Sequence, residues 1–416
     1  GGLNVKINKI LFCLSIVIFS YIFPVYADDE DFEILSDISY VNVSSEINAE
    51  PSINSRSAII YERSSSTILY RKNENKKVKM ASTTKIMTAI IVIEKSNLDD
   101  IVTISRKAAG TGGSRLGLHA EDKISVHDLL YGLLLCSGND AAVALAEYVG
   151  GDVSHFANLM NSKTSELGLT STHFVTPHGL DNDDHYTTAY ELALITNYAL
   201  KNETFRKIVG TKHYNVSING YSKNLSNTNE LLGNLDGVYG VKTGFTNGAN
   251  RCLVTSVKRN NMDLICIVLG ADTKKDRTKD SCQLIEYAFQ NYKMVDIKEK
   301  ITNEFANWKI CNSASFIVEK GVSNSVDVVL EDLQYNFLPV NCNLINDISI
   351  YIYCNTTFKA PLPANTSIGY ITVCVDNKTL LTLNIYNSNY IPSKGYLNFF
   401  DTIIKNYTYH LEALFY

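Results

Sequence analysis

The stretch ASTTKIMTAIIVIE, residues 81–94, contains the only Ser-x-x-Lys sequence in the 416-residue chain. After Ser82 and Lys85 the residues are mostly apolar, which predicts a buried helix that begins near Ser82. A spacing of three residues at the start of a helix places the Ser hydroxyl and the Lys amine on one face. The first helical turn also offers backbone N–H groups to a developing negative charge. The stretch predicts a serine nucleophile with a lysine base; the alternative is a Ser cap followed by an exposed Lys.

A second polar motif, Ser137-Gly138-Asn139, lies between an apolar segment at 129–136 and an Ala-rich helix predicted at 141–148. The Ser-x-Asn pattern recurs elsewhere in the chain, so the pattern alone says little. Its position says more, because a polar tripeptide between two buried helices indicates a loop that points into a cleft.

The third motif is Lys242-Thr243-Gly244, the only Lys-Thr-Gly in the chain. Residues 238–245 alternate as in a strand, and the apolar runs at 252–257 and 264–269 are expected to follow as antiparallel partners. A glycine on such a strand lets another backbone approach closely, which suits a peptide substrate that docks along the strand edge.

In this order, on helix, loop and strand, the three motifs resemble those of the penicillin-binding proteins and serine β-lactamases. The sequences ASTTKIMTA (81–89), SGNDAAVALAE (137–147), TPHGLDN (176–182) and VKTGFTNGAN (241–250) are similar to the low-molecular-weight D-alanyl-D-alanine carboxypeptidases. The resemblance runs from about residue 58 to residue 287. It implies a mixed α/β (α+β) transpeptidase fold, with an antiparallel sheet flanked by helices and a small C-terminal β-domain.

The resemblance also implies a role for each motif residue. Ser82 would attack the carbonyl between the two terminal D-alanines of a peptidoglycan stem pentapeptide, and water would hydrolyse the acyl-enzyme. Lys85 would take the Ser82 proton, which requires a neutral amine, and Ser137 would relay a proton to the leaving D-alanine. Asn139 would bind the substrate peptide or the Lys85 amine. β-Lactams would acylate Ser82 as substrate mimics, and neither a metal nor an organic cofactor is expected.

The same resemblance predicts where the substrate binds. The backbone N–H groups of Ser82 and Phe245 would form an oxyanion hole, in which losing one donor costs on the order of 3 kcal/mol. The free carboxylate of the substrate would meet Thr243 and Arg277, which lies 35 residues after Lys242 (277 − 242), where the family carries its carboxylate-binding arginine. The alternative for Arg277 is a solvated side chain in a basic run.

Three nearby polar residues are expected to be structural. His178 precedes Gly179, which predicts a turn in a positioned loop rather than a catalytic histidine. Asp181 and Glu147 are interpreted in the same way.

Two other functions share the motifs. A class A β-lactamase deacylates with the Glu of a Glu-x-x-Leu-Asn loop, and the nearest segment here, at Glu191, has no such Asn. A non-catalytic wall-binding protein is disfavoured because all the motif residues are present. One departure from the carboxypeptidase pattern is Asn250-Arg251, where many members carry Gly and then an aromatic residue; it affects the expected shape of the cleft.

Composition excludes further functions. The chain carries 38 Lys+Arg against 43 Asp+Glu, a net charge of −5, and its basic residues form no block longer than a pair. Nucleic-acid binding is therefore not expected. The eight His are scattered without a metal-binding pattern, and the nine Cys form no Cys-x-x-Cys pair, so no metal site and no disulfide are assigned.

The N-terminal sequence predicts export. Residues 1–27 contain two Lys, an uncharged run and a small-residue cleavage pattern, as in a secretory signal peptide. The alternative is an uncleaved anchor. A polar linker is expected at 28–54, before a catalytic domain at 55–292. The enzyme is then expected outside the cytoplasm, at the cell wall or the outer face of the cytoplasmic membrane.

The C-terminal part changes in texture. Short apolar runs broken by Asn, Asp and Pro predict a small all-β, sandwich-like domain at 295–393. At 396–416 apolar residues recur every three or four positions, which predicts an amphipathic helix. Two interpretations stay open for this helix: packing against the preceding domain, or peripheral contact with a membrane.

Overall fold

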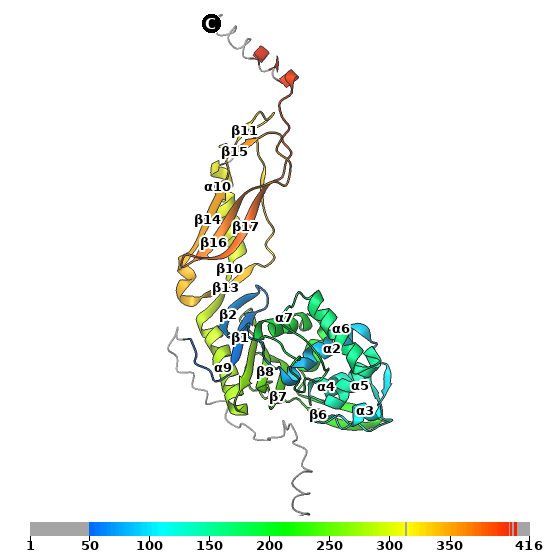
Figure 1. The fold of residues 1–416 in the computed structure, drawn as a ribbon. Coiled ribbons are helices and arrows are strands. Elements are labelled where there is room, and N and C mark those ends of the chain that lie inside the picture. Colours follow the sequence, from blue (N-terminus) through cyan, green and yellow to red (C-terminus); the bar gives the residue numbers. More distant parts are fainter. Residues whose placement is uncertain (1–49, 313, 399, 402, 406–416) are drawn as a thin grey trace, which may run out of the picture. The chain divides into compact units, whose positions relative to one another are not determined.

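The computed structural model describes residues 50–312, 314–398, 400–401 and 403–405. The predicted signal peptide and nearly all of the predicted linker lie outside these residues. Within them, the chain forms two compact units (Figure 1). The first comprises 50–63, 68–259 and 263–288, and the second comprises 64–67, 260–262 and the described residues from 289 onward.

The first unit is built on a five-stranded sheet in the order β2-β1-β9-β8-β7, so that β7 lies at one edge. The strands of this sheet are β1 (Ser57–Glu62), β2 (Thr67–Lys72), β7 (Val238–Thr246), β8 (Asn250–Arg259) and β9 (Met262–Ala271). Two small antiparallel pairs join β3 (Ile101–Thr103) to β4 (Lys123–Ser125) and β5 (His213–Ile218) to β6 (Tyr221–Ser226). The helical segments are η2 (Ala81–Thr84), α2 (Lys85–Lys95), α3 (Arg106–Ala109), α4 (Val126–Leu134), α5 (Asn139–Gly150), α6 (Val153–Glu166), α7 (Ala189–Ala199), α8 (Glu203–Val209) and α9 (Lys274–Asn291).

The sheet is covered on both faces. Helix α9 lies on one side of it, and the group containing α2 and α4–α7 lies on the other (Figure 1). Strand β1 pairs antiparallel with β9, and β7 pairs antiparallel with β8. Because both faces are buried, β9 is a nearly continuous apolar run rather than an alternating one, and β8 buries every residue from 252 to 257, including Thr255 and Ser256. The predicted antiparallel sheet flanked by helices is confirmed.

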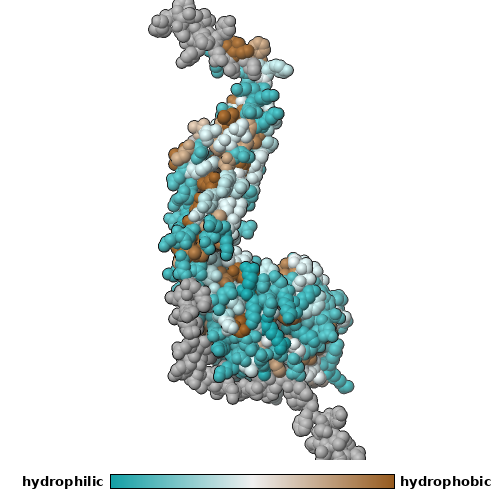
Figure 2. Space-filling view, turned by 60° about the vertical axis from the view of Figure 1, so that its left-hand side comes forward, coloured by the Kyte–Doolittle hydropathy of each residue, from teal (hydrophilic) through white to brown (hydrophobic). Residues whose placement is uncertain are grey.

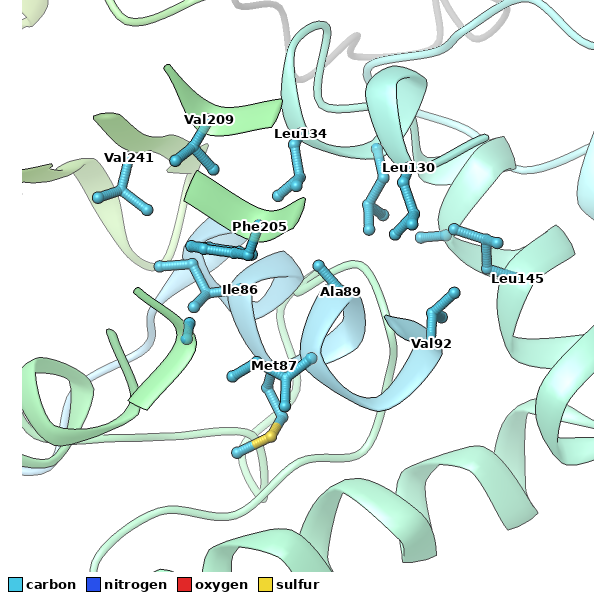
Figure 3. Packing of buried hydrophobic residues seen from close by; sticks show 14 of the residues in the cluster. Ile86, Met87, Ala89, Val92, Leu130, Leu134, Leu145, Phe205, Val209 and Val241 are labelled. Carbon is cyan, nitrogen blue, oxygen red and sulfur yellow. The ribbon is translucent and has the colours of Figure 1, made fainter. Parts of the chain in front are cut away.

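Helix α2 is buried over most of its length. Its residues from 85 to 92 are all buried. Ile86 lies beside Phe205 of α8, on the side of the helix that faces Val209 and Val241, whereas Met87 points to the opposite side (Figure 3). A helix packed in this way cannot shift without disrupting the core, so the turn at its N-terminus has a fixed position.

The second unit combines a sheet with one long helix. Its strands are β10 (Tyr292–Asp296), β11 (Ile317–Glu319), β12 (Val328–Leu330), β13 (Phe337–Asn341), β14 (Ile348–Cys354), β15 (Thr357–Lys359), β16 (Ser367–Val375) and β17 (Lys378–Asn387), and its helices are α10 (Ile297–Asn312) and η3 (Cys342–Asp347). The main sheet has the order β12-β17-β16-β14. Hydrophobic side chains reach the surface of this unit at several points (Figure 2).

The expectation of an all-β domain is wrong in one respect, because α10 forms part of its core. Ile297 and Ile301 are fully buried on this helix and cluster with the inner face of the sheet. Phe305 and Trp308 continue the stripe and pack against the same cluster. The spacing of four, four and three residues is that of an amphipathic helix, and it was hidden among the short β-like runs around it.

The predicted C-terminal helix is described only in part. Residues 396–398, 400–401 and 403–405 are helical, and Tyr396 and Leu397 are 92% and 84% exposed. Packing of these two side chains against the preceding domain is therefore not observed; residues 406–416 lie outside the described residues. No helix in the described part of the chain is both long and apolar enough to span a membrane.

Candidate active site

The predicted nucleophile and base lie within hydrogen-bond distance of each other. Ser82 is on η2, a 3₁₀ turn that leads directly into α2. Side chains three residues apart are eclipsed in a 3₁₀ helix. Lys85, which is fully buried, therefore points its Nζ at Ser82 Oγ, 2.8 Å away. The interpretation of these residues as a helix cap followed by an exposed lysine is wrong.

Two further acceptors fix the Lys85 amine. Its Nζ donates to Asn139 Oδ1 at 2.7 Å and to the carbonyl oxygen of His178 at 3.0 Å. Asn139 is at the start of α5 and is itself oriented, because its Nδ2 donates to the Gly112 carbonyl. Three separate segments thus converge on one amine.

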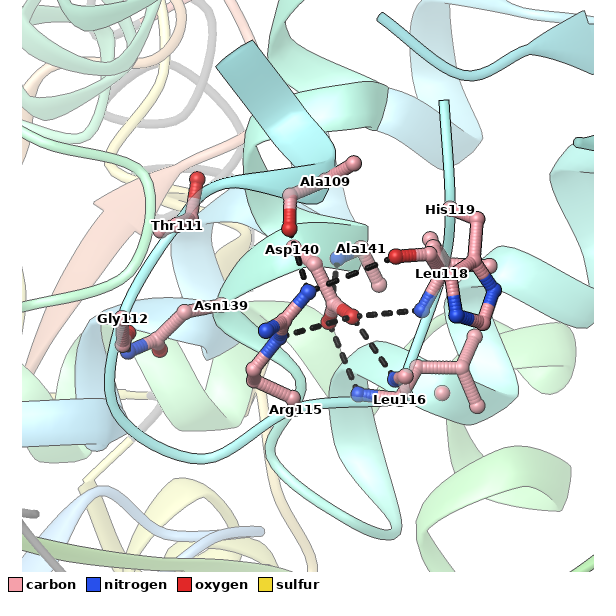
Figure 4. A network of polar contacts seen from close by, with 12 residues as sticks. Ala109, Thr111, Gly112, Arg115, Leu116, Leu118, His119, Asn139, Asp140 and Ala141 are labelled. Atoms are coloured by element: carbon pink, nitrogen blue, oxygen red, sulfur yellow. Dashed lines mark hydrogen bonds and ion pairs between the residues drawn. The ribbon is translucent and has the colours of Figure 1, made fainter. Parts of the chain in front are cut away.

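A buried carboxylate holds the loop that orients Asn139. Asp140 accepts hydrogen bonds from the backbone N–H groups of Leu116, Gly117 and Leu118 (Figure 4). The Arg115 guanidinium lies 3.8 Å from the same carboxylate. Backbone N–H groups that converge on an ionised carboxylate form strong, charge-assisted bonds. The loop containing Gly112 is therefore tied to the helix that carries Asn139.

Ser137 is in an unusual state for a buried serine. Its φ is +61°, in the left-handed region, and the residue is fully buried. Its Oγ has no hydrogen-bond partner among the described residues. An unsatisfied buried hydroxyl costs about 1–3 kcal/mol, and such strain at a loop beside a reactive serine indicates a functional constraint.

The segment from 176 to 185 closes over the nucleophile turn. Gly179 has a φ of +88°, and a Cβ there would lie 1.9 Å from the Ala81 carbonyl oxygen. His185 adds a hydrogen-bonded connection: its Nε2 lies 2.8 Å from Thr84 Oγ1, which donates to the Ala81 carbonyl oxygen. The Val175 N–H donates to His185 Nδ1, so Nε2 carries the proton. His185 is thus a brace for the turn.

Both histidines of this segment are neutral at physiological pH. Burial, with a smaller effect of the Lys85 amine, lowers the pKa of His178 to about 3. Burial also lowers the pKa of His185 to about 4. His178 Nδ1 accepts the Leu180 N–H, which agrees with the predicted positioned loop.

The Lys-Thr-Gly strand passes directly beside Ser82. A Cβ on Gly244 would lie 3.1 Å from the Ser82 backbone nitrogen and 3.2 Å from that of Thr83. Lys242 and Thr243 are each 1% exposed, and Thr243 Oγ1 lies 2.7 Å from Thr228 Oγ1. The strand end is fixed by Asp181, which accepts from Thr246 Oγ1 and from the Gly248 N–H. Asp181 is structural, as predicted.

Arg277 is not a solvated side chain. It is 1% exposed, and its Nη2 donates to both carboxylate oxygens of Glu230, at 2.7 and 2.8 Å. Thr278 Oγ1 donates to Glu230 as well. Although burial opposes its ionisation, Glu230 has a lowered pKa because of the Arg277 charge and these hydrogen bonds. The structure pairs the predicted carboxylate-binding arginine with a carboxylate of its own chain.

Three further residues considered in the sequence analysis, Arg251, Glu191 and Glu147, each contact a partner of their own. Arg251, the departure from the family pattern, has its guanidinium 3.7 Å above the ring centre of Phe245. Glu191 accepts from the backbone of Thr170 and Ser171 and is thereby engaged outside the cluster around Ser82. Glu147 accepts from Ser105 Oγ, as a structural residue would.

The motifs could not show the contacts of three residues that hold the site together. Asp140 has its partners 22–24 residues away, and His185 reaches back 101 residues to Thr84. Glu230 is 47 residues from Arg277. The one available signal was Asp140, which directly follows the Ser-x-Asn motif.

Among the described residues, no cluster of three or more potential metal ligands occurs, and all eight described cysteines are free.

Comparison with known proteins agrees with this geometry. Residues 44–273 match the family described as D-alanyl-D-alanine carboxypeptidase. The chain is 31% identical to the D-alanyl-D-alanine carboxypeptidase DacF of Bacillus subtilis, over 85% of this chain and 90% of that protein. It is 30% identical to DacA of Escherichia coli over 96% of both. The structure resembles penicillin binding protein 5 from Haemophilus influenzae, with a TM-score of 0.68 and 28% identity over 83% of this chain and 99% of the other. The chain therefore belongs to the D-alanyl-D-alanine carboxypeptidase family.

Proposed function

We propose that this chain removes the terminal D-alanine from peptidoglycan stem pentapeptides through an acyl-enzyme on Ser82. The observation that carries the proposal is the Lys85 amine, 2.8 Å from Ser82 Oγ and held by Asn139 and the His178 carbonyl. This arrangement is that of an activated nucleophile whose base is oriented by further groups.

The first half-reaction forms the acyl-enzyme. Lys85, entering as the neutral amine, takes the Ser82 hydroxyl proton while Oγ attacks the carbonyl carbon of the penultimate D-alanine. The oxyanion faces the N–H groups of Ser82 and Phe245, a placement supported by the close passage of Gly244 beside Ser82. Ser137, whose hydroxyl has no partner among the described residues, gives its proton to the leaving amine and takes in its place the proton that Lys85 received from Ser82. Terminal D-alanine departs as the C–N bond breaks.

The second half-reaction restores the enzyme. Water adds to the acyl carbonyl, the ester bond to Ser82 breaks, and Oγ regains its proton. The net reaction consumes one water and yields the shortened peptide and free D-alanine. Lys242 and Thr243 bind the substrate from the strand side, and Arg277 provides the positive charge for its terminal carboxylate.

Penicillins acylate Ser82 in the same way and are covalent inhibitors. A β-lactamase would need a deacylating base. The candidate nearest to the class A pattern, Glu191, is held by backbone N–H groups at 170–171. We therefore expect the penicilloyl adduct on Ser82 to be hydrolysed slowly.

We also infer that the enzyme acts outside the cytoplasm. Support comes from the signal-like sequence at 1–27 and from peptidoglycan as the substrate. Peripheral membrane contact through 396–416 is consistent with the exposure of Tyr396 and Leu397.

The test is the intact mass of purified residues 28–416 through time after addition of benzylpenicillin. We expect an adduct that persists for minutes or longer, and release of D-alanine from a pentapeptide. Ser82→Ala should show neither. Lys85→Met, which keeps the side-chain bulk but lacks the amine, should acylate slower by roughly 10²–10⁴-fold. Rapid loss of the adduct with consumption of penicillin would indicate a β-lactamase, and no adduct would indicate a non-catalytic wall protein.

A further inference from the structure

The pair formed by Glu230 and Arg277 is built to present the guanidinium in one orientation. Both hydrogen bonds from Arg277 to Glu230 use the single nitrogen Nη2. The other two nitrogens, Nη1 and Nε, are left out of this interaction, and Nε is buried without a hydrogen-bond partner among the described residues. An arginine that only neutralises a carboxylate commonly uses two nitrogens side by side.

Glu230 is itself fixed from a second direction. Thr278, the residue after Arg277 on α9, donates its hydroxyl to Glu230 Oε1. The side chain of Glu230 is 17% exposed, and its lowered pKa keeps the carboxylate charged at neutral pH. The acceptor that holds Arg277 is therefore ionised and immobile.

The loop that carries Glu230 also contacts the Lys-Thr-Gly strand. Thr228, two residues before Glu230, has its Oγ1 2.7 Å from Thr243 Oγ1 and its N–H bonded to the Leu135 carbonyl. Asn229, between them, has a buried Nδ2 with no partner among the described residues. One short loop thus joins the strand that would bind the substrate to the arginine that would bind its carboxylate.

From these contacts we infer that Glu230 is a positioning residue for substrate selection: it holds Arg277 by Nη2 so that the rest of the guanidinium meets the terminal carboxylate of the peptide. This inference rests on the proposed function. It makes a specific statement about selectivity. Removing Glu230 should weaken recognition of the free carboxylate and leave the chemistry at Ser82 intact.

The experiment measures kcat and KM for two peptides cleaved at the same bond. One is an acylated tripeptide ending in Lys-D-Ala-D-Ala, and the other has its terminal carboxylate converted to a carboxamide. Glu230→Ala should lower kcat/KM for the carboxylate peptide by about 30-fold, mainly through KM. It should change kcat/KM for the carboxamide by less than about two-fold. Glu230→Gln, which keeps an oxygen acceptor for Nη2 and for Thr278, should lose less.

Two control variants define the result. Asp236→Ala removes the same charge from a side chain on the same loop that is 91% exposed, and it should leave both peptides unaffected. Arg277→Ala should lower selectivity for the carboxylate, and adding Glu230→Ala to it should lower selectivity no further, because both act through one contact.

Different outcomes overturn different statements. If Glu230→Ala lowers kcat/KM equally for the two peptides, or lowers it for neither, the preference for the carboxylate is unchanged and the role of Glu230 is overturned. Release of D-alanine by the wild type would still support the proposed function. If Glu230→Ala does not fold, the same comparison with Glu230→Gln decides. Failure of the wild type to release D-alanine would overturn the proposed function, and the inference with it.

Discussion

The two units of the chain bury polar side chains to very different extents. In the first unit Lys85, Lys242, Arg277 and Asp140 are each at most 1% exposed. In the described part of the second unit the buried polar side chains are Ser65, Asn291 and Asn387, and none of them is charged. Burying charged groups is unfavourable unless they are paired and hydrogen-bonded. The first unit therefore carries a set of polar groups that stability alone does not explain, whereas the second has the core expected of a supporting structure.

Backbone conformation shows the same difference. Ala81, the residue before Ser82, and Ser137, two residues before Asn139, both have positive φ. In the second unit Asn365, Asp376 and Asn377 also have positive φ, but they lie in turns and are of types that tolerate this region; Lys320 and Ser66 are of other types. Strain in the first unit is thus placed where the geometry of a site requires it.

Among substitutions outside the three motifs, the largest effect on acylation is expected from Gly179→Ala. The added Cβ would lie 1.9 Å from the Ala81 carbonyl oxygen, so the nucleophile turn must move. A displacement of about 1 Å at a reacting group lowers rates by on the order of 100-fold. The rate of penicillin acylation, measured by mass spectrometry, checks this.

Gly168→Ala is the matched control. Gly168 also has a positive φ, +72°, but a Cβ there meets nothing within 4 Å. This variant should lose about 1 kcal/mol of stability from the backbone alone and acylate at the normal rate. Equal acylation rates in the two variants would show that the close approach at Gly179 is not important.

A pair of identical substitutions separates the two units. Ile86 in α2 and Ile371 in β16 are both fully buried. Each change to Ala should lower the free energy of unfolding of its unit by about 2–5 kcal/mol. Ile86→Ala should also slow acylation several-fold, because Ile86 packs under the turn that carries Ser82 and Lys85. Ile371→Ala should leave acylation unchanged, and a slower rate in this variant would contradict the division of roles.

The smallest effect on acylation is expected from pH. His178 and His185 stay neutral well below pH 6, so neither should add an inflection near pH 6.5 to the acylation rate. Stability behaves differently, because the unfolded chain binds a proton at each His near pH 6.5 and the folded chain does not. Stability is therefore full above pH 6.5 and is lost as pH falls toward the folded pKa values.

Between pH 6.5 and pH 5, neutral His185 should cost the folded state about 2 kcal/mol of unfolding free energy, because each pH unit between the unfolded and folded pKa values corresponds to about 1.4 kcal/mol. Urea unfolding of the wild type and of His185→Gln at pH 7 and pH 5 measures it, and the variant should lose less on acidification. The described part of the second unit contains no His, so its unfolding should not show this dependence. Parallel losses in wild type and variant would contradict the burial of a neutral His185.

The sequence predicts the centre of the candidate site because its chemistry is encoded locally. Ser82 and Lys85 are neighbours through the helical spacing alone, and the order of the three motifs places Asn139 and Gly244 beside them. The antiparallel sheet follows from apolar runs of strand length. These features depend on short-range periodicity, which a single sequence displays.

Other contacts join residues that are far apart in the sequence, so no local pattern predicts them. The bracing of Ala81 by His185 and the pairing of Arg277 with Glu230 each join one side chain to a distant part of the chain, and no periodicity marks them. Helix α10 is a different case. Its stripe from Ile297 to Trp308 covers only four positions, and the short β-like runs that follow it in the sequence favour strands, so the local pattern does not distinguish the helix from the β-domain that it joins.

The left-handed backbone at Ala81 and Ser137 limits how this enzyme can be engineered. A stabilisation programme would choose these positions first, since glycine adopts a positive φ without the penalty that a Cβ brings. Yet Ser137 would lose its hydroxyl, and the Ala81 methyl lies 3.2 Å from the point where a Gly244 Cβ would be, so it fills the space beside the strand. Glycine substitutions at Ala81 and Ser137 are therefore to be avoided, and gains in heat resistance should be sought at positive-φ positions outside the candidate site, such as Lys320 in the second unit.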